Sequence, residues 1–589
     1  MKRFFQKLPT FLFLFFGFLP FILSAQWSND PLQNLAIADT VGEQVLPKIQ
    51  PTSDGGCYIS WFDSRDGNYS VYLQRLNSQG AAQWSPRGLL ISGHPQQTWL
   101  VDYDLGVDAN DNAVLVFSDI RNGGSSDLDV FAYKISPGGA FLWGADGIGL
   151  SDLAAPEFEP APKVAITGEG HAVVAWLKSG AEDMVALQKI SAAGQKLWGA
   201  NGILLQGAAG ESLAPCGVVP AGGDSVIALW KNTTGPFWAP VTHLYTQKFA
   251  PDGSPAWDPA GVLIYNLGRI PFFTEPEIYP DGQGGAFCTW EDRPSLSDFN
   301  VGVGHISAAG ALVYPLNGIV VSTFTGRLHL NPTLTSLPQA GETFVFWLEE
   351  DINQSQYGIY GQKFSYQGDR LWSDEGKQFL GLGGNQISFI RSAGADTVLY
   401  VSYFQSSAPN AFDAAVKAFR INRNGDYIWP STELSAASLG NKGRLSMIAN
   451  TERRAFLVWS DERVDLGDIY AQNVNPDGSL GNPVTATGFL PALPPAAFEL
   501  KQNYPNPFNP STTIEYRLPE QGFVALKIFN VLGQEVHTLV SRQQNPGEHR
   551  VVFDGANLPG GVYFYRLWVS TSSGEAGTFS QTRKFLLLK

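Results

Sequence analysis

An aromatic residue recurs along this sequence at intervals of 54 to 60 residues, each time at the end of a short apolar run. The eight positions are Trp61, Phe117, Trp176, Trp230, Trp290, Trp347, Tyr403 and Trp459. The last copy begins at Trp459 and reads WSDERVDLGDIYAQ, and the earlier copies are variants of it. A period of roughly 40 to 60 residues with several short strands per unit is typical of the blades of a β-propeller. The repeat therefore predicts an all-β ring.

Each repeat divides into four short strands. In five copies a proline opens the first strand, 14 or 15 residues before the aromatic, where no ladder donor is required. The second strand ends at the aromatic and is almost continuously apolar, as expected for a strand buried on both faces. A third strand follows, seen at 71–74, and then a turn with glycine four residues before an aromatic, as in Gly80 and Trp84. The fourth strand completes the unit.

The eighth repeat lacks the aromatic that should follow its turn at Asp477-Gly478. The N-terminal segment, however, contains Trp27 and a short apolar run at 35–38 that belongs to no repeat. We expect this segment to supply the fourth strand of the last blade, because such a closure removes exposed sheet edges. The prediction is an eight-bladed β-propeller of four-stranded blades over residues 26–490.

The N-terminus has the order of a secretory signal peptide, with basic residues, an apolar run over 11–23 and then Ser24-Ala25. We expect cleavage near Ala25, with an uncleaved anchor as the alternative, and no transmembrane segment in the mature chain. Acidic residues exceed basic ones by 54 to 39, giving a net charge of −15. This balance disfavours nucleic acid and anionic membranes as partners. The three cysteines are expected to be buried apolar residues rather than disulfide or metal ligands.

Prolines at 491–497 predict a stiff linker. From 498 to 589 the long period stops, and alternating strands separated by glycine and proline turns predict a small β-sandwich of immunoglobulin size. Four separated motifs occur there: QNYPNPFNPSTTIEYRLPE from Gln502, NVLGQEVHTLV from Asn530, LPGGVYFYRL from Leu558, and the closing SQTRKFLLLK.

In this order, the four motifs resemble the type A C-terminal sorting domain of the type IX secretion system. The resemblance covers about ninety residues and departs from the family in an expanded hairpin at 570–578. It implies recognition by the outer-membrane translocon after export to the periplasm of a Gram-negative-type bacterium, followed by secretion or display at the cell surface. The residues that match the motifs are Pro505, Asn506, Pro507, Phe508, Gly533, Gly560, Gly561, Tyr563 and Lys584. An ordinary immunoglobulin-like module for carbohydrate binding is the alternative.

Aspartate and arginine recur shortly after the repeat aromatic. These pairs are Asp63 and Arg65, Asp119 and Arg121, Asp292 and Arg293, and Asp461 and Arg463. A reacting atom needs one unique arrangement of groups, whereas these pairs recur around the ring. We therefore interpret them as local ion pairs that stabilise each hairpin.

Residues that break the repeat pattern are the better site candidates. Glu349, Glu350 and Asp351 replace the usual pair in the sixth repeat, and clustered carboxylates can act as an acid and base pair on a glycoside or bind calcium. The binding candidates are Glu159, Glu275, His305 and His329. A solvated acidic rim without chemistry is the preferred explanation of these carboxylates, because perturbed or clustered charges are often only structural.

Two families of propeller enzymes have related turns. Sialidase-like proteins place glycine three residues before tryptophan, whereas the spacing here is four. Quinoprotein dehydrogenases share the spacing of four, but the aspartate expected before that glycine is generally missing here and no adjacent cysteine pair occurs. The sequence also lacks HExxH, Gly-x-Ser-x-Gly, Cys-x-x-Cys and phosphate-cradling motifs.

The sequence thus favours a secreted or cell-surface module that binds extracellular polysaccharide or protein without catalysis. No cofactor is expected, although calcium binding stays open. The alternative is a propeller-type glycoside hydrolase or lyase that uses the acidic residues of the sixth repeat.

Overall fold

The computed structural model divides the chain into two compact units, Met1–Pro483 and Val484–Lys589, which are described separately. The described residues are 26–94, 102–122, 127–151, 157–236, 239–271, 273–295, 297–407, 413–429, 432–437, 440–464, 466–482, 498–519, 522–544, 547–571 and 578–589. The predicted signal peptide and linker lie outside them. Apart from a single-turn 3-10 helix, η2 (Pro338–Ala340), the regular elements of the described residues are strands, so the all-β prediction is confirmed.

Eight four-stranded antiparallel sheets make up the described part of the first unit. The first four are β2 (Gln44–Pro51), β3 (Cys57–Asp63), β4 (Ser70–Leu76) and β5 (Leu89–Ser92); β6 (Tyr103–Val107), β7 (Ala113–Asp119), β8 (Asp129–Ile135) and β9 (Ile148–Gly149); β10 (Lys163–Ile166), β11 (Ala172–Lys178), β12 (Met184–Ile190) and β13 (Ile203–Leu205); and β14 (Ser212–Pro220), β15 (Val226–Thr234), β16 (Val241–Phe249) and β17 (Val262–Gly268).

The other four sheets follow the same order. They are β18 (Glu277–Pro280), β19 (Ala286–Ser295), β20 (Asp298–Ile306) and β21 (Ile319–Val320); β22 (Arg327–Leu337), β23 (Glu342–Asp351), β24 (Tyr357–Ser365) and β25 (Lys377–Gly383); β26 (Asn385–Ala395), β27 (Val398–Ser407), β28 (Ala414–Asn422) and β29 (Glu433–Ala436); and β30 (Lys442–Ala449), β31 (Ala455–Asp461), β32 (Asp468–Val474) and β1 (Leu35–Ala38).

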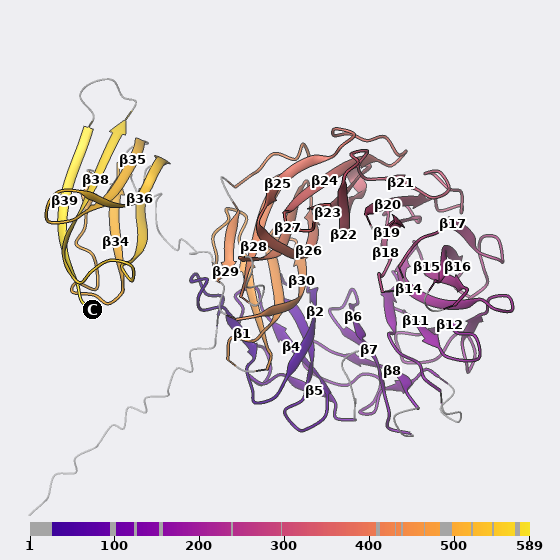
Figure 1. Ribbon diagram of the computed structural model, residues 1–589. Helices are drawn as coiled ribbons and strands as arrows, with labels where there is room; N and C mark the ends of the chain where they lie inside the picture. The colour runs from indigo at the N-terminus through magenta and orange to yellow at the C-terminus, as the bar shows by residue number, and fades with distance from the viewer. Residues whose placement is uncertain are drawn as a thin grey trace, which may run out of the picture. The chain divides into compact units, whose positions relative to one another are not determined.

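The sheets are arranged around a ring, with the first strand of each toward the centre (Figure 1). These first strands contact one another in sequence from β2 through β6, β10, β14, β18, β22, β26 and β30, and β30 contacts β2 again. The second strands β3 and β7 are buried along their whole length, because neighbouring sheets cover both of their faces. The continuous apolar runs before each repeat aromatic therefore become the core between sheets.

An aromatic side chain joins each sheet to the turn of a neighbouring repeat. The Trp84 indole Nε1, for example, donates to the Pro137 carbonyl oxygen at 3.2 Å. At the last junction Trp27 takes this role, since its Nε1 donates to the Ser78 carbonyl oxygen at 3.2 Å. A side chain at Gly80 would lie 2.8 Å from the Trp27 ring, so this close approach requires glycine. The strand β1 pairs antiparallel with β32 in the same sheet.

The second unit has two sheets. One has the order β33 (Glu499–Leu500), β34 (Ser511–Leu518) and β37 (Gly547–Asp554), and the other has the order β36 (Glu535–Gln544), β35 (Gly522–Phe529), β38 (Gly561–Thr571) and β39 (Thr578–Leu587). Burial alternates along β34 and β35, as expected for strands with one face on a core. Side chains of both sheets, among them Ile514, Leu526 and Phe585, form one hydrophobic cluster.

Candidate functional site

A cavity of about 450 Å³ lies where the first strands of the sheets approach the centre of the ring. Six of the eight sheets contribute to it, through residues of their first strands or of the segments leading into them. Its lining residues are Leu46, Pro47, Lys48, Asp102, Lys163, Glu275, Phe389, Arg391, Arg444, Leu445 and Ser446. We call this space the central cavity.

Irregular backbone accompanies the central cavity in several repeats. The pairing of the first and second strands shifts register around Leu46, Phe389 and Arg444, and these residues have φ values of 53°, 51° and 56°. Non-glycine residues with positive φ are uncommon, and bulges redirect side chains where they occur. Strain repeated at equivalent positions marks this part of the ring as a functional candidate.

The charged side chains of the central cavity are mainly cationic. Asp102 is shared between two ammonium groups, with distances of 2.9 Å to Lys48 and 3.0 Å to Lys163. Burial acts to raise the pKa of Asp102, but the two lysines outweigh it and hold that pKa well below its usual value. Within the described part of the chain, Arg391 has no ion pair with a carboxylate. Four basic residues therefore face two acidic ones, Asp102 and Glu275, in a chain whose net charge is −15.

A second cavity of about 420 Å³ shares four residues with the central cavity, namely Glu275, Phe389, Arg391 and Arg444. It adds polar groups from the fifth and sixth sheets, including Asn331 and the ion pair of Glu291 with Arg293 at 2.6 Å. Arg391 and Arg444 therefore line both spaces.

Among the four predicted binding residues, Glu275 lines both cavities, with its side chain 63% exposed and 3.2 Å from the Lys231 ammonium group. Glu159 is fully buried, 3.6 Å from the Lys178 ammonium group, and burial raises its pKa. These two carboxylates do not come together, and Glu159 presents no surface to a ligand.

The two predicted histidines are also buried. His305 is fixed through Nδ1, 2.8 Å from the Tyr366 carbonyl oxygen, and through Nε2, 3.1 Å from an Asp281 carboxylate oxygen. His329 lies with its Nε2 3.4 Å from a Glu349 carboxylate oxygen, and burial lowers its pKa to about 4. Both histidines pack inside the unit and line neither cavity.

The three acidic residues of the sixth repeat do not converge. Glu349 is 2% exposed, accepts hydrogen bonds from the Trp347 Nε1 at 2.8 Å and the Arg327 Nη1 at 3.2 Å, and has a pKa raised by burial. Glu350 follows it in the strand and therefore points to the opposite face, and burial raises its pKa too. The Asp351 carboxylate accepts hydrogen bonds from backbone N–H groups of its own turn, for example from Ser355 at 2.6 Å.

The repeated aspartate and arginine pairs mostly form the local ion pairs that the sequence predicts. Arg121 lies 2.6 Å from Asp119, and Arg463 lies 2.6 Å from Asp461. Arg65 likewise pairs with Asp63. The fifth repeat differs, because Asp292 pairs with Arg269 and Arg293 pairs with Glu291, each at 2.6 Å. The expected pairing of Asp292 with Arg293 is therefore wrong, since Arg269 approaches Asp292 from the segment directly after β17, the fourth strand of the preceding sheet.

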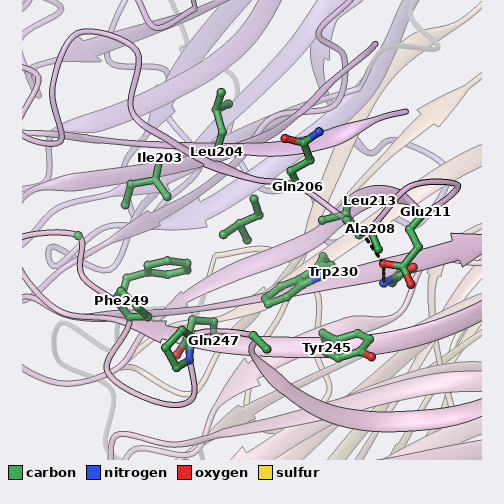
Figure 2. Close-up of a pocket in the computed structure, with 17 residues that line it drawn as sticks. Ile203, Leu204, Gln206, Ala208, Glu211, Leu213, Trp230, Tyr245, Gln247 and Phe249 are labelled. Carbon is green, nitrogen blue, oxygen red and sulfur yellow. Dashed lines mark hydrogen bonds between the residues drawn. The ribbon is translucent and has the colours of Figure 1, made fainter. Parts of the chain in front are cut away.

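A pocket of about 470 Å³ opens in the fourth repeat, beside the short strand β13 (Figure 2). We call it the fourth-repeat pocket. Figure 2 shows Trp230 and Tyr245 on the side of the pocket where Glu211 also lies, with Ile203 and Phe249 toward the other side. The Asn232 amide nitrogen donates to Glu211 at 3.0 Å, while its oxygen is buried without a hydrogen-bond partner. The pocket thus has both apolar and polar walls, with the Glu211 carboxylate and the Asn232 amide oxygen as hydrogen-bond acceptors.

In the second unit, the predicted sorting residues hold the last strand in place. The Asn506 side-chain oxygen accepts from the Leu586 backbone N–H at 2.9 Å, and Phe508 donates its own N–H to the Leu586 carbonyl oxygen at 3.1 Å. Phe508 is 2% exposed within the core of the unit. The Tyr563 hydroxyl donates to the Pro559 carbonyl oxygen at 2.8 Å.

Comparison with family models identifies residues 502–576 as a secretion system C-terminal sorting domain. The recognition made from the four motifs is confirmed. This domain marks the protein for secretion or cell-surface display in Bacteroidetes-type bacteria. In the described part of the chain, no helix combines the length and apolar character needed to cross a membrane.

The chain is also similar to several solved structures. A protein of unknown function from Dyadobacter fermentans is 12% identical, with 54% of this chain and 94% of that chain covered and a TM-score of 0.32. An endo-arabinase from Bacteroides thetaiotaomicron is 11% identical, with 66% of this chain and 97% of that chain covered and a TM-score of 0.27. An α-L-arabinofuranosidase of Fusarium graminearum, solved with arabinobiose, is 10% identical, with 53% of this chain and 92% of that chain covered and a TM-score of 0.30. The curated proteins gave no match.

The basic residues of the central cavity were not predicted from the sequence. Lys48 and Lys163 each directly follow a repeat proline, and Arg391 and Arg444 lie near the same point of repeats that lack it. The expectation that this proline opens the first strand holds for Pro162 but is wrong for Pro47, which lies inside β2 where the strand pairing shifts register.

The proline spacing is visible in the sequence and could have drawn attention to Lys48 and Lys163, each 13 residues before its repeat aromatic. Arg391 and Arg444 lie 12 and 15 residues before Tyr403 and Trp459, so no common spacing marks them in the sequence.

Proposed function

We propose that the protein is a secreted or cell-surface binding module whose central cavity binds an anionic extracellular ligand. The ligand class that we propose is acidic polysaccharide. In this proposal the first unit is an eight-bladed β-propeller, and the second is an immunoglobulin-like sandwich read by the type IX secretion translocon. The observation that carries the proposal is the group of four basic residues around the central cavity of an acidic chain.

Charge and geometry both support an anionic ligand. Asp102 bridges Lys48 and Lys163, and Asp104 interacts with both lysines as well, although burial raises its pKa. The clearer anion donors are Arg391 and Arg444, which line the same space, where a ligand carboxylate or sulfate can reach them. Guanidinium groups bind such anions with two parallel hydrogen bonds. Walls of low dielectric around a cavity of one sign also increase the local concentration of the opposite charge.

The acidic residues favour binding over catalysis. An inverting glycosidase needs two accessible carboxyl groups roughly 6.5 to 9.5 Å apart on either side of the substrate, and a retaining one needs them closer still. Glu349 is buried against Trp347 and Arg327, and Asp351 is held by its own turn. A glycoside hydrolase or lyase that uses these residues is the alternative function.

The test is affinity electrophoresis of residues 26–589 in gels that contain polygalacturonate, methyl-esterified polygalacturonate or neutral arabinan, with reducing ends measured in parallel solutions. We expect retardation by the free acid alone and no new reducing ends. Arg391→Ala combined with Arg444→Ala should weaken retardation at least about tenfold, as loss of two charge-assisted contacts implies. Arg453→Ala is the matched control, since Arg453 is 53% exposed and pairs with Asp396 elsewhere.

Equal retardation by the methyl ester would refute the electrostatic basis of the proposal. New reducing ends that disappear in Glu350→Gln would instead establish the alternative function. Repeating the assay after EDTA treatment tests the expectation that neither calcium nor another cofactor is needed.

A further inference from the structure

Three repeats contain the same arrangement around an arginine, which we call the arginine clip. The guanidinium carbon lies over the ring of an aromatic residue in the third strand, at 4.3 Å for Arg65 over Tyr72 and 3.6 Å for Arg121 over Phe131. The same guanidinium pairs with the carboxylate two residues after the repeat aromatic. Arg463 repeats both contacts, with its guanidinium carbon 4.1 Å from the Tyr470 ring centre.

A backbone carbonyl completes two of these clips. Arg65 donates through Nη1 to the Arg87 carbonyl oxygen at 3.4 Å, and Arg121 donates to the Asp146 carbonyl oxygen at 2.8 Å. Arg87 and Asp146 each follow a docking tryptophan by three residues. A clip therefore consists of an aromatic face, an acceptor side chain and a carbonyl oxygen at fixed positions of the repeat.

The fourth repeat keeps the aromatic floor of the clip but has no arginine. Trp230 and Tyr245 stack at 6.0 Å with an interplanar angle of 15°, close to the 5.8 Å and 16° of Trp61 and Tyr72. Thr234 stands four residues after the aromatic, where the clips have arginine.

The fourth-repeat pocket lies where the arginine side chain lies in the clips of the other repeats. Its lining includes Tyr245, Asn232 and Ala260, and these positions correspond to the three that contact Arg65 in the first repeat. Asn232 is 8% exposed and its side-chain oxygen has no hydrogen-bond partner. The nearby Glu211 carboxylate supplies the negative charge that the clips obtain from aspartate. The pocket thus retains the acceptors for a guanidinium that this repeat does not provide.

We propose that the fourth-repeat pocket binds the guanidinium group of an arginine side chain in a partner polypeptide. This inference goes beyond the proposed function, because it concerns a different cavity and a ligand of opposite charge. The planar cation would lie on the Tyr245 ring, as Arg65 lies on Tyr72, and donate to Asn232 and Glu211. The apolar lining beyond them, including Leu204 and Phe249, suits the aliphatic stem. Among the described residues, no basic side chain lines the pocket, so the α-carboxylate of free arginine gains nothing there.

The test is calorimetric titration of residues 26–589 with N-acetyl-arginine N-methylamide. We expect a dissociation constant on the order of 1 mM, as one cation–π contact and one charge-assisted pair allow. The citrulline analogue has nearly the same shape without the charge, and it should bind at least about tenfold more weakly. Free L-arginine should bind no more tightly than the blocked form.

Two variants locate the binding. Glu211→Gln should weaken binding of the blocked arginine about tenfold, whereas Glu169→Gln, which alters an exposed carboxylate outside the pocket, should leave it unchanged. Thr234→Arg should abolish binding by supplying the missing clip, and Thr234→Ser is its matched control.

Circular dichroism verifies that each variant is folded, and if Thr234→Arg does not fold, Glu211→Gln decides the question. Equal affinity for the citrulline analogue, unchanged affinity in Glu211→Gln, or tighter binding of free arginine would each overturn the proposal.

Discussion

Replacing Trp27 with alanine tests whether the N-terminal segment stabilises the ring at its last junction. The Trp27 side chain is buried, with only 4% of the residue exposed, and its ring stacks on Phe456 at a centroid distance of 5.2 Å. Its Nε1 also donates to the Ser78 carbonyl oxygen. Truncation of a buried tryptophan costs ~3–5 kcal/mol through lost burial and the cavity left behind. We expect the free energy of unfolding to fall by about 4 kcal/mol.

Urea unfolding of residues 26–589, followed by circular dichroism, measures this loss. Trp257→Ala is the matched control, because the Trp257 indole makes the equivalent bond to the Ala308 carbonyl oxygen at 3.1 Å. Trp257 is partly exposed, and the chain is continuous across its junction, so its loss should cost about half as much. A Trp27→Ala effect no larger than that of the control would refute the reasoning that this contact secures the chain ends.

Burial lowers the pKa of His329 to about 4, below the value of about 6.5 expected in the unfolded chain, so the unfolded chain binds the proton more readily. The free energy of unfolding should therefore decrease by up to about 3 kcal/mol as the pH falls from 6.5 to 4. In His329→Gln the urea midpoint should change less with pH over this range. Asp102→Asn should lower stability by about 2 kcal/mol at neutral pH, because Lys48 and Lys163 lose their shared partner. The depressed pKa of Asp102 means that this difference from wild type should shrink as the pH falls below about 4. Deleting residues 574–589 removes β39 and should leave the protein in the periplasm, as measured by protease accessibility on intact cells, and normal surface appearance would contradict the sorting role.

Much of the first unit could be predicted from sequence because its core is built from the repeat itself. The apolar runs that end at Trp61 or Trp459 are too continuous for a strand with a solvent face, so sheets must cover them on both sides. The all-β character and the four-strand pattern follow from this periodicity. The sorting domain was recognisable for a different reason, because each of its motifs is a continuous stretch of sequence and the four occur in the family's order.

The candidate site was only partly predictable. Glu275 lines the central cavity and the second cavity. His305 and His329 are buried, and Glu349 is buried with its carboxylate hydrogen-bonded to Trp347. A polar residue that breaks a repeat pattern can be structural as readily as functional, because a buried polar side chain in one strand can pair with a side chain of another strand. The sequence shows the change but not the compensating partner.

The sequence by itself determined the repeat, the all-β class and the export address, since each depends on residues close together in the chain. Only the tertiary structure decided that Lys48 and Arg391, more than 300 residues apart, line one cavity. It alone decided that the absence of an arginine at Thr234 coincides with an open pocket at Tyr245. The physical reason is that burial, charge compensation and cavity shape depend on which distant segments pack together, and the ring places equivalent positions of separate repeats around a shared centre.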